Sequence, residues 1–117
     1  MKNKVIKYID EKYGAFPEYL WQKDPNSAIW RHDNNRKWFA ILMLVSRERL
    51  GLSGEGKVDI LNVRLSDLLA VDLLTQKDGI IPAYHMQKGR WISVILDGSV
   101  PFEEISPLID ESYGCTM

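Results

Sequence analysis

The sequence predicts an α+β fold, a two-layer domain with helices packed on a five-stranded, mostly antiparallel sheet. Apolar residues recur with a helical period near the N-terminus and in two later segments. The segments between them carry short apolar or alternating runs, which are typical of strands. Most connections between these runs are short, and short connections favour antiparallel neighbours. Blocks of strands and helices without an internal repeat predict an α+β arrangement, in the order α-β-β-β-α-β-β-α.

Length and composition predict one globular domain over residues 1–117, since the chain has 117 residues and 45% of them are hydrophobic. The longest apolar run, Trp38 to Val45, is far shorter than the roughly 20 residues of a membrane span. The N-terminal residues are charged and lack the apolar stretch of a secretory signal. Cys115 is the only cysteine, so no internal disulfide can form. We therefore expect a monomeric cytoplasmic protein without membrane contact.

The first helix is expected over residues 3–13, because Val5, Ile9 and Tyr13 recur every four residues. Asn3 can cap its start, and Gly14 suits its end. The next segment, residues 14–27, contains two prolines and several turn dipeptides, so it is expected to connect the helix to the sheet.

Three strands are expected next, over residues 28–32, 38–45 and 57–64. A polar tip at residues 33–37 joins the first two as a hairpin, and a glycine-containing connection at residues 46–56 precedes the third. The apolar alternation of the third strand changes phase, which is compatible with either a strand buried on both faces or a β-bulge.

A second helix is expected to begin at Ser66 as N-cap and to end near Asp78-Gly79. Its predicted buried stripe consists of Leu65, Leu69 and Leu73, with Leu68 beside them.

Strands over residues 80–85 and 91–96 follow, joined by a second hairpin tip at residues 86–90. The last helix is expected to begin at Ser106-Pro107, after a single turn started by Pro101, because proline breaks hydrogen bonding in a helix interior.

Metal binding and catalysis find little support in the residue spacing. His32, His85 and Cys115 form no recognisable metal-ligand pattern, and a metal site needs three or four converging ligands. His85 could act as a base toward Tyr84 or Ser93, but nothing in the spacing selects them. We therefore expect no enzymatic activity, no metal and no cofactor.

The two hairpin tips carry the strongest candidate for ligand contact. Cations and amides gather at each tip, and a tryptophan, Trp38 or Trp91, stands at each base. Lysine and arginine contact phosphates, and amides read base edges. The net charge of −1 does not argue for a basic nucleic-acid binder. Residues 31–90, however, hold ten Lys/Arg against seven Asp/Glu, and local charge determines affinity for nucleic acid.

Several motifs in order along the chain resemble the MmcQ/YjbR family. They are Ile29-Trp30-Arg31-His32, Asn35-Arg36-Lys37-Trp38-Phe39-Ala40, Val58-Asp59-Ile60-Leu61-Asn62, Pro82-Ala83-Tyr84-His85-Met86, Trp91-Ile92, Leu96-Asp97-Gly98-Ser99-Val100-Pro101 and Asp110-Glu111-Ser112-Tyr113. The resemblance implies a CyaY-like or secretion-chaperone-like α+β domain. It also implies a DNA-binding protein whose two hairpins act as a double wing. The chain departs from the family pattern at Asp33-Asn34, at Gly89-Arg90 and at Pro107.

The sequence and the resemblance together predict a site for double-stranded DNA on the two tips. Its residues are Arg31, His32, Asn35, Arg36, Lys37, His85, Lys88 and Arg90. The alternative is a protein-interaction or adaptor domain without a nucleic-acid role, which would present a large exposed apolar patch. A third interpretation, a small-molecule site, requires a closed pocket that holds His85 with Tyr84 and Asn62.

Overall fold

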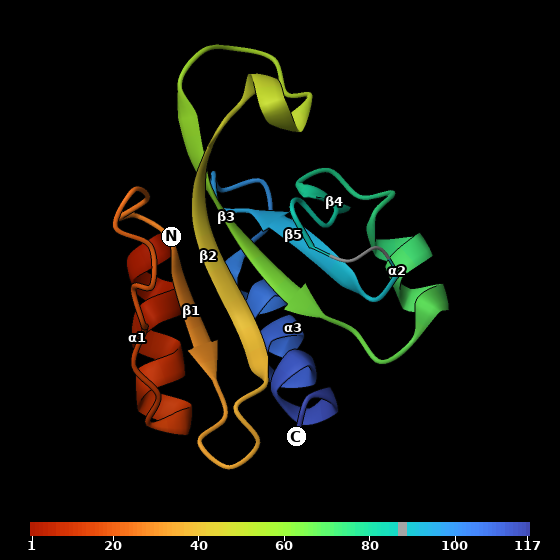
Figure 1. Ribbon diagram of the computed structural model, residues 1–117. Helices are drawn as coiled ribbons and strands as arrows, with labels where there is room; N and C mark the ends of the chain where they lie inside the picture. The colour runs from red at the N-terminus through yellow and green to blue at the C-terminus, as the bar shows by residue number, and fades with distance from the viewer. Residues whose placement is uncertain (87–88) are drawn as a thin grey trace.

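The computed structural model describes residues 1–86 and 89–117, and its elements follow the expected order (Figure 1). The elements are α1 (Lys2–Tyr13), β1 (Ala28–Arg31), β2 (Trp38–Ser46), the 3-10 helix η1 (Glu48–Leu50), β3 (Lys57–Arg64), α2 (Leu68–Leu74), β4 (Ile80–Pro82), β5 (Trp91–Ile95) and α3 (Phe102–Cys115). In the described ranges, no helix is long and apolar enough to cross a membrane.

The strands form a five-stranded sheet in the order β1-β2-β3-β5-β4, and each neighbouring pair is antiparallel. The predicted α+β fold class is therefore confirmed. β3 lies at the centre and pairs with β2 and β5 without interruption of the register. The change of phase in the apolar alternation of β3 thus reflects burial of this strand on both faces and not a β-bulge. Leu61 and Val63 pack toward the main core, whereas Val58 and Ile60 pack on the opposite face.

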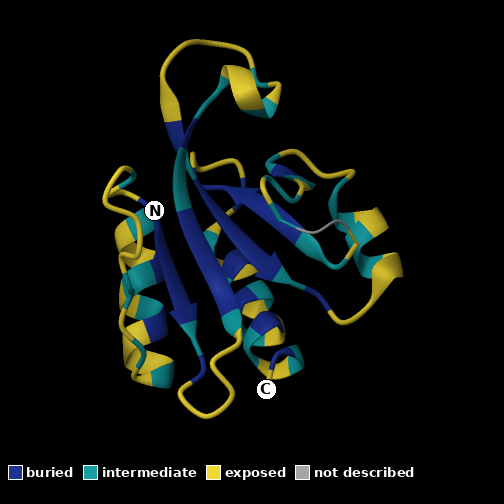
Figure 2. Cartoon of the chain, in the orientation of Figure 1, coloured by how far each residue is buried: buried dark blue, intermediate teal, exposed yellow. Residues whose placement is uncertain are grey.

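Helices α1 and α3 cover one face of the sheet and enclose the main core (Figure 1). Val5 and Ile9 of α1 and Ile105 and Ile109 of α3 are fully buried against the strands. Dark blue in Figure 2 accordingly fills the central strands, and yellow marks the outer sides of the helices. The opposite face carries a smaller cluster, to which Leu50 contributes from η1 and Tyr84 from the connection between β4 and β5. This face is therefore less deeply covered than the helix-packed face.

The predicted buried stripe of α2 is wrong for three of its four leucines. Leu65 is buried, but it precedes the helix, which begins at Leu68 behind the N-cap Asp67 rather than Ser66. Leu68, Leu69 and Leu73 are each more than half exposed. The helix has seven residues beside the edge strand β4. Its packed residues are Ala70, Val71 and Leu74.

The predicted start of the last helix is also wrong, because α3 runs from Phe102 through Pro107 without interruption. Pro107 is exposed, so its ring displaces no core packing, and it removes a single backbone donor in the second turn. The predicted Asn3 cap of α1 is likewise absent, since α1 begins at Lys2 without a side-chain cap. The predicted end at Gly14 is confirmed: the residue is left-handed and donates its N–H to the Asp10 carbonyl.

Candidate functional site

The first tip and the described residues just before β5, Gly89 and Arg90, lie at the same end of the sheet. β2 and β5 both run antiparallel to β3, so both begin at the end where β3 finishes. Residues 33–37 lead into β2, and residues 86–90 lead into β5. The C-terminal end of α3 reaches the same end of the molecule (Figure 1). The fold thus brings together two segments that lie about fifty residues apart in the sequence.

An open depression with a volume of about 450 Å³ lies between the bases of the tips. We call it the strand-end depression. It is lined by Lys37, Trp38, Arg64, Trp91, Cys115 and Thr116. Two aromatic side chains and two cations therefore face one hollow. Arg64 is not among the site residues predicted from the sequence, because this residue ends β3 and belongs to neither tip.

A buried serine of α3 holds β2 and β3 apart at this end. The hydroxyl of Ser112 accepts a hydrogen bond from the backbone N–H of Arg64 at 2.8 Å. It donates another to the carbonyl of Phe39 at 2.5 Å. The pairing of β2 with β3 ends one residue earlier, at Ala40 opposite Val63. Ser112 thus replaces the next direct strand contact, and the depression opens where the strands separate.

The cations at this end differ in how much of their charge is available. Arg36 and Lys37 are exposed, and Arg36 has a left-handed backbone with a φ of 62°. The guanidinium of Arg64 lies 3.4 Å from the carbonyl of Cys115. Arg90 donates to the carbonyl of Ser66. Lys88 lies outside the described residues.

Acidic groups offset part of this charge. The carboxylate of Glu111 accepts a hydrogen bond from the N–H of Ser66, whose carbonyl is the acceptor for Arg90. Glu111 therefore lies near Arg90 and reduces its field. Arg36, Lys37 and Arg64 remain as the principal cations of the strand-end depression and its rim, with Asp33 as the acid of the first tip.

Arg31 belongs to an ion pair within the protein. Its Nε and its terminal nitrogen each donate to the carboxylate of Glu18 at 2.8 Å. The hydrogen bond from Arg31 lowers the pKa of Glu18. A paired guanidinium offers little charge to a phosphate, so the predicted DNA role of Arg31 is not supported by its placement.

His32 and Asn35 tie the first tip to α3. The His32 ring is buried against Phe39 and Tyr113, and its Nε2 lies 2.8 Å from the hydroxyl of Thr116. Burial lowers the pKa of His32, because desolvation disfavours the charged imidazolium. The amide of Asn35 donates to the Thr116 carbonyl at 3.0 Å. His32 is engaged inside the protein and lacks the exposed position that the predicted DNA contact requires, whereas Asn35 is exposed and uses its amide within the protein.

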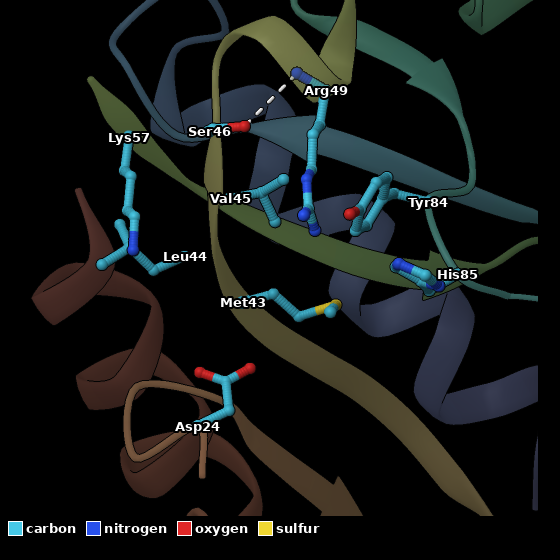
Figure 3. Close-up of a pocket in the computed structure, with 9 residues that line it drawn as sticks. All are labelled: Asp24, Met43, Leu44, Val45, Ser46, Arg49, Lys57, Tyr84 and His85. Carbon is cyan, nitrogen blue, oxygen red and sulfur yellow. Dashed lines mark hydrogen bonds between the residues drawn. The ribbon is translucent and has the colours of Figure 1, made fainter.

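His85 lies on the sheet face opposite α1 and α3, and not at the tip. It is exposed, and its ring stands edge-on to the ring of Tyr84. Figure 3 shows both side chains above the strands together with Met43 and Arg49. Asn62 is fully buried beneath them and donates to the Tyr84 carbonyl at 2.9 Å. The closed pocket required by the small-molecule interpretation is therefore replaced by an open groove without Asn62 in its lining.

Three residues that the sequence did not single out as site residues shape these surfaces, namely Arg49, Arg64 and Ser112. Arg64 could have been found from its position, since the last residue of a central strand must lie beside the start of its neighbours. Ser112 lies in the motif Asp110-Glu111-Ser112-Tyr113, but nothing in that motif marks it as a bridge between strands, and Arg49 carries no local signal. In the described parts of the chain, no group of three or more His, Cys, Asp or Glu residues is placed to hold a metal ion.

Comparisons with known proteins place the chain among close relatives. The family model described as YjbR matches residues 10–115. The Bacillus subtilis (strain 168) protein YyaQ, described as uncharacterized, is 43% identical over 112 residues, which cover 96% of this chain and 94% of the relative. Escherichia coli (strain K12) YjbR, also described as uncharacterized, is 38% identical over 52 residues, or 44% of each chain.

Two solved structures show the same fold. A Pseudomonas syringae protein has a TM-score of 0.96 at 38% identity, and the match covers 100% of this chain and 99% of that one. A Deinococcus radiodurans protein with a DUF419 domain has a TM-score of 0.72 at 20% identity, and the match covers 97% of this chain and 75% of that one. At that low identity, the second likeness concerns the fold alone.

Proposed function

The chain belongs to the YjbR family, and from the residues around its strand-end depression we propose that it binds double-stranded DNA. The observation that carries the proposal is that the starts of β2 and β5 and the end of β3 meet at one hollow beside the first tip. This hollow presents Lys37 and Arg64 beside Trp38 and Trp91, with Arg36 on the adjacent tip. In this proposal the protein acts as a cytoplasmic monomer that binds without catalysing a reaction.

The physical basis is electrostatic attraction to the phosphate backbone. Exposed lysine and arginine side chains replace counterions along DNA, so affinity depends steeply on salt. Arginine can also contact a phosphate with two parallel hydrogen bonds. Arg36, Lys37 and Arg64 are the cations placed to do this, and Arg90 is a weaker contributor beside Glu111. Two tips at one end of the sheet could contact phosphates on both sides of a groove.

Binding to a labelled DNA duplex can be measured by fluorescence anisotropy between about 50 and 200 mM salt. We expect the logarithm of the affinity to fall linearly with the logarithm of salt concentration, with a slope of about −0.9 for each phosphate contacted. The double variant Arg36→Glu, Lys37→Glu should abolish binding.

The matched control is Lys2→Glu, Lys4→Glu at the start of α1, which changes net charge equally at another surface. This control should bind within a few-fold of the unchanged protein. Absence of binding at about 50 mM salt, or equal loss in both double variants, would contradict the proposal.

A second candidate function, binding of a protein partner, is supported by two exposed apolar surfaces. The segment before β1 exposes Phe16, Tyr19, Leu20 and Trp21, and α2 exposes Leu68, Leu69 and Leu73. Exposed fractions of these seven side chains range from 40% to 71%. Clusters of large exposed apolar side chains mark interaction sites in many proteins.

The α2 surface can be tested with the variant Leu69→Glu, Leu73→Glu. Because both side chains are exposed, we expect the free energy of unfolding to change by less than about 1 kcal/mol. Partners recovered from a nuclease-treated lysate should be lost with this variant and retained with Lys2→Glu, Lys4→Glu. Recovery of the same partners by both variants would exclude α2 as the partner-binding surface.

A further inference from the structure

The sheet face opposite α1 and α3 carries a groove made of two adjoining hollows, with volumes of about 330 and 360 Å³. We call it the sheet-face groove. The two hollows share Asp24, Met43 and His85, so they form one continuous surface. Their sizes fall at the lower end of the range typical of small-molecule sites.

One half of the groove is apolar and aromatic. Its lining includes Trp21, Trp38, Ile41, Met43 and Met86. The rings of Trp21 and Trp38 meet edge to face with centroids 6.0 Å apart. Trp21 is 40% exposed, so a large apolar side chain stands at the rim and is open to solvent. This half offers a surface for a flat or aliphatic group.

The other half is polar, and Arg49 is its central cation. Figure 3 shows the Arg49 side chain extending from η1 over the strands, with its guanidinium between Val45 and Tyr84. Among the described residues, this guanidinium makes no hydrogen bond or ion pair. Arg47, two residues earlier, instead donates to the Ser53 carbonyl at 2.8 Å and pairs with Asp97 at 3.9 Å. The two arginines of one short segment thus differ: Arg47 secures the connection, and Arg49 faces the groove.

A buried polar network fixes the rim opposite Arg49. Ser93 is fully buried, accepts a hydrogen bond from the Tyr84 N–H at 2.8 Å and donates one to Asn62. Asn62 in turn donates to the Tyr84 carbonyl. Both backbone groups of Tyr84 are therefore held from below, and His85 follows with a left-handed φ of 56°. Such a conformation is costly for histidine and persists where the surroundings enforce it, often at ligand sites.

The charges give the groove a direction. Arg49 and Lys57 line the polar half, and Lys23 lines the apolar half beside Asp24. Asp24 lies at the far side in Figure 3, with Met43 between it and Arg49, and its carboxylate accepts the hydroxyl of Ser27. An anionic group is attracted to Arg49 and repelled by Asp24. A bound molecule would therefore place its anion at Arg49 and its apolar part over Met43 and Trp38.

We propose that the sheet-face groove binds a small amphipathic anion, with a carboxylate, sulfonate or phosphate at Arg49 and an aromatic or aliphatic body over Met43 and Trp38. Tyr84 and His85 form the side of the site, held in place by Asn62 and Ser93. The site uses a different face from the helix-packed core and a different cation from the strand-end depression. It would exist whether or not the protein binds DNA.

Two fluorescent compounds of nearly equal shape test this assignment. Anilinonaphthalenesulfonate is an aromatic anion, and phenylnaphthylamine is its uncharged counterpart without the sulfonate. Titration of the full chain should give saturable, one-to-one binding of the anion. Arg49→Gln should raise its dissociation constant about tenfold or more, because a charge-assisted contact is lost. The same variant should change the dissociation constant of the uncharged compound less than twofold.

Two further variants test whether the effect on anion binding comes from the positive charge at position 49. Arg49→Lys keeps the positive charge and should restore most of the affinity for the anion. Lys4→Gln removes one charge from the exposed side of α1 and should leave both dissociation constants unchanged. Because Arg49 and Lys4 are exposed, these variants are expected to fold, which thermal unfolding by circular dichroism can verify.

Three outcomes would overturn the proposal. They are non-saturable binding of the anion, equal effects of Arg49→Gln on the charged and uncharged compounds, and equal effects of Arg49→Gln and Lys4→Gln on the anion. Loss of DNA binding in the tip variants with retained binding of the anion would separate the two sites.

Discussion

Ser112 has a structural role that reaches the candidate DNA site. Its hydroxyl is fully buried and bridges Arg64 of β3 and Phe39 before the β2–β3 pairing begins. Without it, an N–H and a carbonyl would lose their partner inside the protein. The position of Arg64 in the strand-end depression therefore depends on a residue of α3.

Ser112→Ala should lower the free energy of unfolding by about 1–3 kcal/mol, because it leaves a buried donor and a buried acceptor unsatisfied. Chemical denaturation measures the change. Ser53→Ala, at an exposed serine in the connection before β3, should stay within about 0.5 kcal/mol of the unchanged protein. Equal stability of the two variants would show that the Ser112 hydroxyl does not bridge the strands.

His32 predicts a pH dependence of stability. Burial lowers its pKa in the folded protein, whereas the unfolded chain has a pKa near 6.5. As the pH falls below about 6.5, the unfolded state therefore takes up a proton that the folded state resists. Stability should decline from about pH 7.5 to 5.5, and His32→Gln should make this decline smaller. A decline unchanged in His32→Gln would contradict the assignment.

At the scale of elements, α1 and α3 are joined by a cluster around Asp110. Its carboxylate accepts hydrogen bonds from Lys12 at 2.9 Å, from Tyr13 at 2.5 Å and from Tyr8 at 2.8 Å. Burial by itself would raise the pKa of Asp110, but these hydrogen bonds outweigh it and the pKa is lowered. Burial and the bond to Asp110 raise the pKa of Tyr13. The cluster thus favours a charged aspartate and neutral tyrosines.

The cluster should stabilise the protein above the unfolded pKa of aspartate, near 4, and its contribution should disappear as the pH falls through the lower pKa of the folded state. Asp110→Asn should cost about 1–3 kcal/mol at pH 7. It should also make the loss of stability below about pH 4 smaller, as measured by thermal unfolding across pH. Glu103→Gln, at an exposed acid in the first turn of α3, is the control and should keep the acid-induced loss.

At the scale of the whole molecule, Trp38 connects the two proposed sites. It lines the strand-end depression and also the apolar half of the sheet-face groove. Trp91 lines the depression, and Trp21 lines the groove. The two surfaces therefore meet at one side chain, at the first residue of β2.

Trp38→Ala should weaken DNA binding, because the strand-end depression loses part of its wall, and should weaken binding of the aromatic anion by about 0.5–1.5 kcal/mol, the usual contribution of an aromatic pair. Trp91→Ala should affect DNA alone, and Trp21→Ala should affect the aromatic anion alone. Anisotropy and fluorescence titrations on the three folded variants measure these effects. If Trp38→Ala changed one of the two affinities and not the other, the sites would not share this wall.

The candidate site was partly predictable from the sequence. The tips themselves, with Arg36 and Lys37, follow from local polarity between apolar runs. Arg31 and His32 carry the same residue types, but their roles depend on Glu18 and on α3, which lie elsewhere in the chain. Arg49 and Arg64 became candidates only when neighbouring strands and η1 placed them beside hollows.

The sequence by itself determined the order of elements, most strand limits and the position of both tips, because periodicity and turn chemistry act between residues close in the chain. Tertiary structure alone decided which face of α2 is buried and whether α3 continues through Pro107. It also decided that His32 is interior and that Ser112 separates two strands. These outcomes depend on packing between distant segments, and the free energy of such contacts is not encoded in any local pattern.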